Sequence, residues 1–301
     1  MDLGTNTFHL LIVEGNTSGF SEIIHEQQAV KLGEGGINKG FIQPAAFQRG
    51  IDCMKRYSNL ISDNGVTRMK AIATSALRNA ANGQEFISEV QKQAGISIEI
   101  IDGNAEAEYI YKGVRAGGGL LAANTLIVDI GGGSVEFIIC DEEEIKWKQS
   151  FEIGAARLMD SFHRHDPISG ESITALNFYL GDTLKPLFTA LENYSIHNVI
   201  GSSGVFESYA AIIEADNGHS FDLKKTRYYE FDKANLLTII ERLILSNHQQ
   251  RLDNPKIIPV RVDMIVTASL LTRFIIEKTG ADEIAMSTNS LKEGVLADML
   301  N

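Results

Sequence analysis

The chain has 301 residues, of which 44% are hydrophobic and 22% are charged, and its formal net charge is −12 at pH 7. This composition supports a sizeable core and excludes an intrinsically disordered protein, while the length suits one large domain or two ordinary ones. A general nucleic-acid binder is also excluded, because such proteins are normally basic. Cys53 and Cys140 lie far apart without CxxC spacing, which argues against a disulfide framework or a zinc site and favours a reducing compartment.

The first element predicted along the chain is a glycine turn followed by a strand, in the segment DLGTNTFHLLIV. Gly4 permits a tight turn because it lacks a Cβ, and such a turn lets backbone N–H groups and small side chains approach an anion. The small polar side chains in question are Thr5, Asn6 and Thr7. The apolar residues that follow predict a strand over residues 8–14.

Asp2 stands directly before this turn and directly after Met1. A carboxylate at the entry to a glycine turn can hold a divalent cation, either directly or through water. Because so little sequence precedes Asp2, either the strand that would lead into it is missing or the sequence begins at an internal position of a longer chain. A missing central strand would destabilise the first sheet.

The next elements alternate between strands and helices. The patterns predict strands over 20–32 and 69–74 and helices over 44–63 and 82–94. Arg78 falls in a short helix after the second of these strands. An exposed arginine commonly pairs with a carboxylate, but a guanidinium also matches phosphate oxygens bidentately, so residue type alone leaves both roles open for Arg78.

A strand is predicted over 96–101, and the helix that follows carries two glutamates with different environments. Asn104 is a plausible N-cap. Glu108 shares a helix face with Lys112, which predicts an ion pair four residues apart. Glu106 lies on the packed face, where it is either a helix N-terminal glutamate favoured by the macrodipole or a functional carboxylate. Glycines from residue 113 onwards are expected to end this helix and to form a hinge.

The second half opens with the strongest motif, the segment LIVDIGGGSVEFII over 126–139. An apolar strand ends at Asp129, three glycines form a turn, and a second apolar strand follows, so we predict a hairpin rather than the strand-to-helix step of a nucleotide P-loop. Ser134 can donate a hydrogen bond to phosphate, and Glu136 can orient a water. The turn glycines are Gly131, Gly132 and Gly133. Without further evidence, these glycines are equally explained by a tight hairpin turn that binds no phosphate.

The two glycine turns are versions of one pattern. Asp2 and Thr7 are five residues apart, as are Asp129 and Ser134, and an apolar strand follows each turn. An internal repeat of this kind predicts a duplicated domain. We therefore expect two phosphate-gripping turns that face each other across a cleft.

The remaining elements complete the second half. They are strands over 145–153, 198–201 and 283–287 and helices beginning near 154, over 170–193, after 204, over 232–247, over 261–279 and over 290–300. Pro186 predicts a break in the helix over 170–193. Arg157, near the start of the helix at 154, could either bind phosphate or pair with a carboxylate.

The two turns together resemble those of the superfamily of acetate and sugar kinases, heat-shock chaperones and actin. Within it, DLGTNTFHL and VDIGGGSVE resemble the exopolyphosphatase and guanosine pentaphosphate phosphohydrolase family, also called Ppx/GppA, in its short two-domain type. Further segments fit in order: KLGEGG, ATSALRNAAN, GNAEAEYIYKGV, IGAARL, GSSGVFESYA and STNSLKEGV. The resemblance therefore runs nearly end to end.

The resemblance implies an α/β fold with two ribonuclease H-like domains of the actin-like ATPase superfamily. Each would have a mixed sheet flanked by helices, with a cleft between the domains. Domain I would comprise residues 1–116 plus 288–301, and domain II residues 117–287. A homodimer would be in keeping with the family.

The resemblance also implies an activity, the release of terminal phosphate from inorganic polyphosphate or guanosine pentaphosphate. Glu106 matches the family's catalytic glutamate, the base that activates water, and Glu136 would assist it. A partly desolvated glutamate has a raised pKa, which suits a base. Mg²⁺ or another divalent cation would lie near Asp129, possibly with Asp2, and offset repulsion in an acidic cleft. Phosphate would be held by Gly4, Thr5, Asn6, Thr7, Arg78, Gly131, Gly132, Gly133 and Ser134.

Two alternatives remain open. A kinase of the same superfamily would move phosphate from ATP to a small acceptor, although such kinases typically place their base elsewhere than at Glu106. A non-catalytic sensor would bind guanosine polyphosphates without turnover. No signal peptide or membrane-spanning run is recognisable, so we expect a cytoplasmic protein with no membrane and no nucleic-acid polymer as partner.

Overall fold

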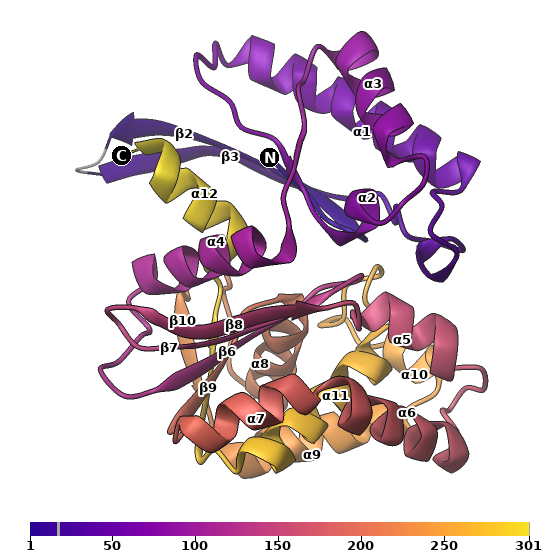
Figure 1. Cartoon of the computed structure of the whole chain (residues 1–301), viewed down its shortest axis with the longest axis vertical. Coiled ribbons are helices and arrows are strands. Elements are labelled where there is room, and N and C mark those ends of the chain that lie inside the picture. The colour runs from indigo at the N-terminus through magenta and orange to yellow at the C-terminus, as the bar shows by residue number, and fades with distance from the viewer. Residues whose placement is uncertain (17–18, 301) are drawn as a thin grey trace.

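The computed structural model describes residues 1–16 and 19–300 and has two lobes, each built on a mixed β-sheet flanked by helices (Figure 1). The first lobe is drawn in indigo and purple, and the second in magenta to orange. Two helices, α4 (Gly103–Ala116) and α12 (Leu291–Leu300), lie between the sheets of the two lobes. Within the described ranges, no helix has the length and apolar character needed to cross a bilayer.

The first sheet, counted over the described residues, has five strands in the order β3-β2-β1-β4-β5. Their bounds are β1 (Asp2–Leu3), β2 (Thr7–Asn16), β3 (Gly19–Ala29), β4 (Ile72–Ala73) and β5 (Glu99–Ile100). Strand β1 pairs antiparallel with β2 and parallel with β4, so a central strand is present but is only two residues long. The carbonyl of Met1 extends this pairing by accepting a hydrogen bond from the Ile72 N–H at 3.1 Å.

The helices of the first lobe cover one face of this sheet. They are α1 (Pro44–Asp63), α2 (Ser75–Arg78) and α3 (Gly83–Ala94), preceded by the 3₁₀ turn η1 (Ile37–Lys39). Helix α1 begins at Pro44, whose missing N–H is not needed in a first helical turn. Its buried face packs with Phe8 of β2 in one hydrophobic cluster, and the Tyr57 hydroxyl donates to the Phe8 carbonyl at 2.8 Å. The strand that follows the first glycine turn is thereby anchored to a packed core.

The second sheet repeats the spatial order of the first. It runs β10-β11-β9-β6-β7-β8, so β8-β7-β6-β9-β11 corresponds to β3-β2-β1-β4-β5. The strands are β6 (Thr125–Ile130), β7 (Val135–Cys140), β8 (Ile145–Phe151), β9 (Asn198–Gly201), β10 (Tyr228–Phe231) and β11 (Glu283–Ser287). In both sheets the first pair forms a hairpin around a glycine turn and the next pair is parallel. The predicted duplicated ribonuclease H-like fold is confirmed.

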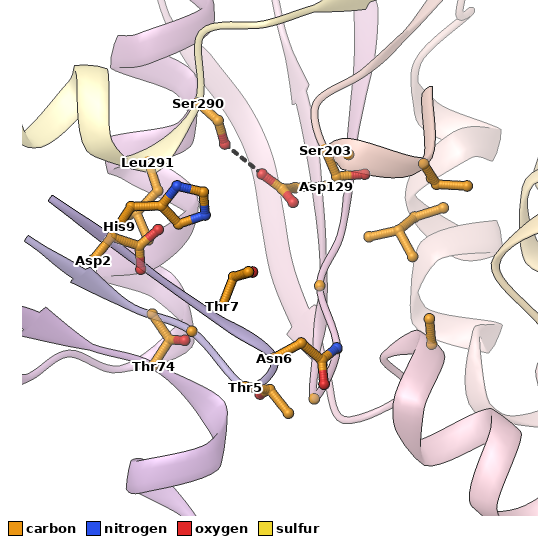
Figure 2. Close-up of a pocket in the computed structure, with 18 of the residues that line it drawn as sticks. Asp2, Thr5, Asn6, Thr7, His9, Thr74, Asp129, Ser203, Ser290 and Leu291 are labelled. Atoms are coloured by element: carbon orange, nitrogen blue, oxygen red, sulfur yellow. Dashed lines mark hydrogen bonds between the residues drawn. The ribbon is translucent and has the colours of Figure 1, made fainter. Parts of the chain in front are cut away.

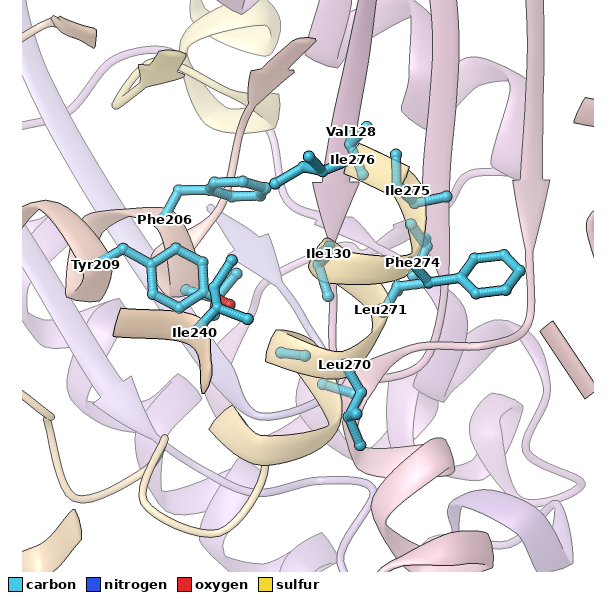
Figure 3. Close-up of a cluster of buried hydrophobic side chains, with 14 of the residues drawn as sticks. Val128, Ile130, Phe206, Tyr209, Ile240, Leu270, Leu271, Phe274, Ile275 and Ile276 are labelled. Atoms are coloured by element: carbon cyan, nitrogen blue, oxygen red, sulfur yellow. The ribbon is translucent and has the colours of Figure 1, made fainter. Parts of the chain in front are cut away.

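A large core lies between the second sheet and its helices (Figure 3). These helices are α5 (Ala155–Phe162), α6 (Gly170–Thr183), α7 (Lys185–Asn193), α8 (Gly204–Asp216), α9 (Lys233–Leu245), α10 (His248–Leu252) and α11 (Ile265–Thr279). Helix α11 is apolar on most of its surface, as a helix enclosed by other elements must be. Figure 3 shows Leu271 and Phe274 of α11 together with Val128 and Ile130 of β6. The strand that carries Asp129 is therefore held rigidly. The predicted break near Pro186 is confirmed by the division between α6 and α7.

Helices α4 and α12 join the lobes. Helix α4 packs against β7 and β8 on the face of the second sheet opposite the large core, and α12 packs along α4 and touches β2. A third hydrophobic cluster runs through this layer from Ile72 of the first sheet to Ile127 of the second. The domain bounds 1–116 plus 288–301 and 117–287 stay a prediction.

Two glycines allow α4 and α12 to approach closely. A Cβ on Gly113 would lie 1.9 Å from the Ser290 carbonyl oxygen, and one on Gly294 would lie 1.8 Å from the Tyr109 carbonyl oxygen. Both contacts are with backbone, which cannot rotate away. Gly113 itself lies inside α4, which ends at Ala116, so the prediction that the helix ends within the glycine-containing stretch that starts at residue 113 is confirmed.

We expect Gly113→Ala to lower the free energy of unfolding by about 1–3 kcal/mol, because the added methyl group forces α12 away from α4. Chemical denaturation measures the change. Gly181→Ala is the matched control, since Gly181 is also helical but its added Cβ meets nothing within 4 Å. That control should stabilise by about 0.4–1 kcal/mol. Equal effects of the two substitutions would contradict the close packing.

Two local predictions about α4 are wrong. The helix is capped by Asp102, whose Oδ1 accepts a hydrogen bond from the Ala105 N–H at 2.8 Å, rather than by Asn104. Glu108 pairs with Lys148 of β8 instead of Lys112. The second difference arises because α4 packs on β8, which brings a cation from another element closer than the one on the helix.

Candidate functional site

A cavity of about 250 Å³ lies between the lobes, and both glycine turns line it. Predicted site residues from both lobes line it too: Asp2, Gly4, Thr5, Asn6, Thr7, Glu106, Asp129, Gly131, Gly132, Gly133, Ser134 and Glu136. Figure 2 shows Asp2, Thr5, Asn6 and Thr7 of the first lobe around the same space as Asp129 of the second. The structure thus brings together almost every residue that the sequence motifs singled out.

The two turns also touch each other, and this contact needs glycine. A Cβ on Gly132 would lie 2.2 Å from Asn6 Nδ2, and one on Gly133 would lie 2.7 Å from Thr5 Oγ1. The three carbonyls of the second turn accept hydrogen bonds from the backbone N–H groups of residues 154–156, at 2.9 to 3.1 Å. The start of α5 therefore fixes the turn in place, and the turn fixes the first lobe against the second.

Glu106 enters the cavity from the first turn of α4. Its side chain is 8% exposed, and its Oε2 accepts a hydrogen bond from Arg78 Nη1 at 3.0 Å. Burial raises the pKa of Glu106 well above its usual value, the nearby Glu136 raises it further, and Arg78 opposes both effects. A raised pKa makes the ionised carboxylate a better proton acceptor, which suits a general base.

Glu136 and Asp129 are register neighbours on β7 and β6. The Glu136 Oε1 accepts a hydrogen bond from Ser150 Oγ at 2.6 Å. Burial, followed by the charge of Asp129, raises the pKa of Glu136 to about 8. Burial likewise raises the pKa of Asp129 to about 7, although hydrogen bonds from Ser290 and Ser202 lower it.

Asp2 faces Asp129 across the cavity, and its surroundings leave it incompletely bonded. None of the residues that the structure describes donates a hydrogen bond to the buried Asp2 Oδ1, and burial raises the pKa of Asp2 to about 6. Asp129 Oδ2 accepts a hydrogen bond from Ser290 Oγ at 2.6 Å, drawn as a dashed line in Figure 2. Unpaired buried carboxylate oxygens are costly unless a cation or a proton reaches them.

These donors fit a magnesium ion. Mg²⁺ is commonly held by one or two carboxylates together with substrate phosphates and waters, rather than by a complete protein cage. Asp2 and Asp129 are the residues that could contact the ion.

Arg78 is the one predicted site residue that does not line the cavity. It lies beside the cavity, where Nη1 donates to Glu106 and to the Ile101 carbonyl at 3.1 Å, and Nη2 donates to Glu152 Oε1 at 3.1 Å. Of the two roles left open from sequence, the structure shows the pairing of Arg78 with carboxylates, beside the cavity. Binding of phosphate by Arg78 stays a prediction.

Several cavity residues escaped the sequence-based prediction. Lys292, next to Glu293 at the start of α12, is the clearest case, with Nζ 3.0 Å from Glu293 Oε1. Although burial lowers it, the charges of Glu293, Glu207 and Asp2 raise the pKa of Lys292 overall. Its signal was present, because the segment STNSLKEGV that carries the resemblance contains this lysine.

Two other missed residues border the cavity on opposite sides. Within the part of the chain that the structure describes, the buried Nδ1 of His9 on β2 has no hydrogen-bond partner, and burial lowers the pKa of this histidine to about 3. Arg261 pairs with Glu207 at 2.8 Å, and it packs so closely on Gly204 that a Cβ there would lie 1.9 Å from its Nη2. Neither residue forms a local pattern that would have identified it.

The buried carboxylates predict an unusual dependence of stability on pH. Asp2, Asp129 and Glu136 have raised pKa values, so the folded state binds more protons than the unfolded state. Without divalent cations, we expect the free energy of unfolding to fall as pH rises from about 4 to about 8. Mg²⁺ should restore more stability at about pH 8 than at about pH 5, because it binds ionised carboxylates.

Denaturation curves at several pH values, with chelator and with Mg²⁺, measure this dependence. Asp129→Asn is the internal control, because removing one of the titrating groups should flatten the decline. Stability that rises with pH in the presence of chelator would contradict the prediction.

Comparison with known proteins places this geometry among phosphatases. Residues 11–301 match the model of the Ppx/GppA phosphatase family. An exopolyphosphatase from Cytophaga hutchinsonii has a closely similar structure, with a TM-score of 0.96 and 38% identity over 99% of this chain and 96% of that one. A Ppx/GppA enzyme of Aquifex aeolicus, at a TM-score of 0.81 and 24% identity over 99% and 97% of the chains, supports the fold alone.

Curated relatives are similar over the whole chain. Exopolyphosphatase 2 of Mycobacterium tuberculosis is 27% identical over 308 residues, covering 98% of this chain and 96% of that protein. A guanosine-5'-triphosphate,3'-diphosphate pyrophosphatase of Vibrio cholerae is 26% identical over 305 residues, covering 100% of this chain. The chain spans 58% of the length of that pyrophosphatase.

Proposed function

Because the chain belongs to the Ppx/GppA phosphatase family, we propose that it releases terminal phosphate from inorganic polyphosphate, from guanosine pentaphosphate or from both. The observation that carries this proposal is the buried Glu106 carboxyl, which opens into the cavity lined by both glycine turns. An enzyme that cuts a phosphoanhydride needs a phosphate cradle and a base beside it. The names of the relatives in both activity classes agree with this substrate range.

In the proposed reaction, the phosphate chain enters the cavity between the lobes. The glycine turns hold its terminal phosphate through backbone N–H groups and through the hydroxyls of Thr5, Thr7 and Ser134. Lys292 adds the positive charge that an acidic protein needs at an anion site. Holding the phosphate in one orientation supplies much of the rate enhancement in phosphoryl transfer.

Glu106 then accepts a proton from the attacking water. Arg78 fixes the orientation of the carboxyl through Oε2, and the other oxygen, Oε1, is left for the water. The negative charge of Glu136 raises the pKa of Glu106. Glu136 also helps to orient the water. A divalent cation near Asp129 and Asp2 would neutralise charge on the phosphate oxygens.

Phosphate release by the purified protein tests the proposal. The assay uses Mg²⁺ with polyphosphates of several lengths and, separately, with guanosine pentaphosphate. We expect release from at least one class, and the ratio of kcat/KM values identifies the preferred one. Binding of guanosine polyphosphate without release would contradict hydrolysis and leave the sensor. Formation of ADP from ATP only when an acceptor is present, without release of free phosphate, would leave the kinase.

A further inference from the structure

Glu152 lies at the edge of the cavity, where it bridges the two lobes. It follows β8 of the second lobe, and its Oε2 accepts a hydrogen bond from Ser75 Oγ at 2.6 Å in the first lobe. Oε2 also contacts Arg157 Nη2 at 2.9 Å, and Oε1 contacts Arg78 Nη2 at 3.1 Å. Its side chain is 42% exposed, so solvent reaches this carboxylate.

The groups that bind Glu152 form a donor set suited to phosphate. Two guanidinium groups and one hydroxyl converge on a single carboxylate, and guanidinium groups bind phosphate oxygens as they bind carboxylate oxygens. Both arginines are largely buried, with Arg78 17% and Arg157 13% exposed. Their charges are therefore less screened by water than those of surface arginines.

Each arginine is fixed independently of Glu152. Arg157 Nε donates to the Gly133 carbonyl at 2.8 Å, and its Nη1 donates to the Ile37 carbonyl at 2.7 Å. Arg78 Nη1 donates to the Ile101 carbonyl and to Glu106. In both arginines Nη2 is the nitrogen that points to Glu152. If Glu152 moved away, these donors would remain in place around the vacated position.

This donor set adjoins the proposed active site on two sides. Arg78 joins it to Glu106, the proposed base, and Arg157 joins it to Gly133 of the phosphate-gripping turn. Ser75 reaches the same turn, because a Cβ on Gly133 would lie 2.5 Å from its Oγ. A chain of phosphates whose terminal group occupies the turns would extend within reach of this set.

We propose that Ser75, Arg78 and Arg157 form a second phosphate subsite, which Glu152 occupies in the free protein and which a penultimate phosphate takes by displacing it. The inference rests on the proposed function, since it deepens that site. Glu152 is then a specificity-determining residue that competes with substrate. It weakens binding of every ligand that needs the subsite and leaves ligands with a single phosphate unaffected.

Binding of inorganic tripolyphosphate, measured by calorimetry in chelator so that turnover is absent, tests the subsite directly. Glu152→Gln keeps the size of the side chain and removes its charge. We expect this variant to bind tripolyphosphate roughly tenfold more tightly than the wild type and to bind orthophosphate equally well. Glu143→Gln, at the exposed tip between β7 and β8, is the matched control for the loss of one charge and should change neither affinity.

Unchanged or weaker tripolyphosphate binding by Glu152→Gln would overturn the subsite and leave Glu152 as a tie between the lobes. Absence of tripolyphosphate binding in both proteins would overturn it as well. A double-mutant cycle adds a check, because the gain from Glu152→Gln should shrink when Arg157 is replaced by Met. An undiminished gain would contradict the role of Arg157.

Kinetic measurements show which of the two substrates uses the subsite. They also distinguish a failure of the subsite from a failure of the proposed function. In Glu152→Gln, KM should fall about tenfold for the source whose second phosphate uses the subsite, with kcat within about twofold of the wild type. The assay is run with polyphosphate and with guanosine pentaphosphate. If the wild type releases no phosphate while Glu152→Gln still binds tripolyphosphate more tightly, hydrolysis fails and the subsite stands. If the wild type releases phosphate but Glu152→Gln does not bind tripolyphosphate more tightly, the proposed function stands and the subsite fails.

Discussion

Glu106→Gln is expected to lower phosphate release by about 10²–10⁴-fold while substrate binding is retained, because a positioned base contributes a factor of this size. The amide keeps the size of the side chain and can still accept the hydrogen bond from Arg78 Nη1, so the local structure should survive. Without a carboxylate, however, no group at this position can take the proton of the attacking water.

The pH profile gives this experiment a second readout. Because burial raises the pKa of Glu106, the wild-type rate should increase with pH as that carboxyl ionises, and the residual activity of Glu106→Gln should lack this limb. Glu108→Gln, two residues along the same helix and paired with Lys148, is the matched control and should retain near wild-type kcat. Substantial activity in Glu106→Gln with the same pH limb would exclude Glu106 as the base.

Asp129→Asn should reduce Mg²⁺-dependent release at least about 100-fold, because replacing a group that contacts a metal costs more than disturbing its surroundings. The same variant should be more stable than the wild type above pH 7 in chelator. Burial raises the pKa of Asp129 to about 7, so ionising it in the folded state is unfavourable, and an uncharged side chain removes that cost.

Loss of activity together with a gain in Tm distinguishes this outcome from simple unfolding. Asp141→Asn is the contrasting control. Its carboxylate pairs with Lys146 and accepts backbone hydrogen bonds from residues 143 and 144, which hold the pKa of Asp141 at about 2. Replacing it should leave activity unchanged and should not raise Tm. A fall in Tm for Asp129→Asn would contradict the view that the ionised Asp129 carboxylate destabilises the fold and is kept for function.

The fold was predictable because its main signals are local and repeated. Asp2 and Asp129 each precede a glycine turn and an apolar strand, and the structure places the two turns in corresponding positions of two sheets with one strand order. The same patterns selected residues that line the cavity, since a turn that has room for an anion must be built from glycine and small polar residues.

The ion pairs around the cavity were not predictable in this way. Glu152 and Ser75 are 77 residues apart, and nothing near either residue indicates that the lobes bring them together. Lys292 reaches the site because α12 returns across α4 to the first lobe. The wrong pairing predicted for Glu108 has the same origin, because a helical neighbour was available in sequence but a strand from the other lobe was closer in space.

Because α12 returns across α4 to the first lobe, the site is completed late in the synthesis of this part of the chain. Ser290, which donates a hydrogen bond to Asp129, and Lys292, which lines the cavity, follow β11 in the chain and are therefore synthesised after the strands of both sheets. Domains generally fold as units in the order of synthesis, so both sheets can form before this segment emerges. Asp129 would lack its serine partner and the cavity its lysine until then. A nascent chain therefore carries no complete phosphate site, and a chain truncated before residue 290 should fold in part but remain inactive.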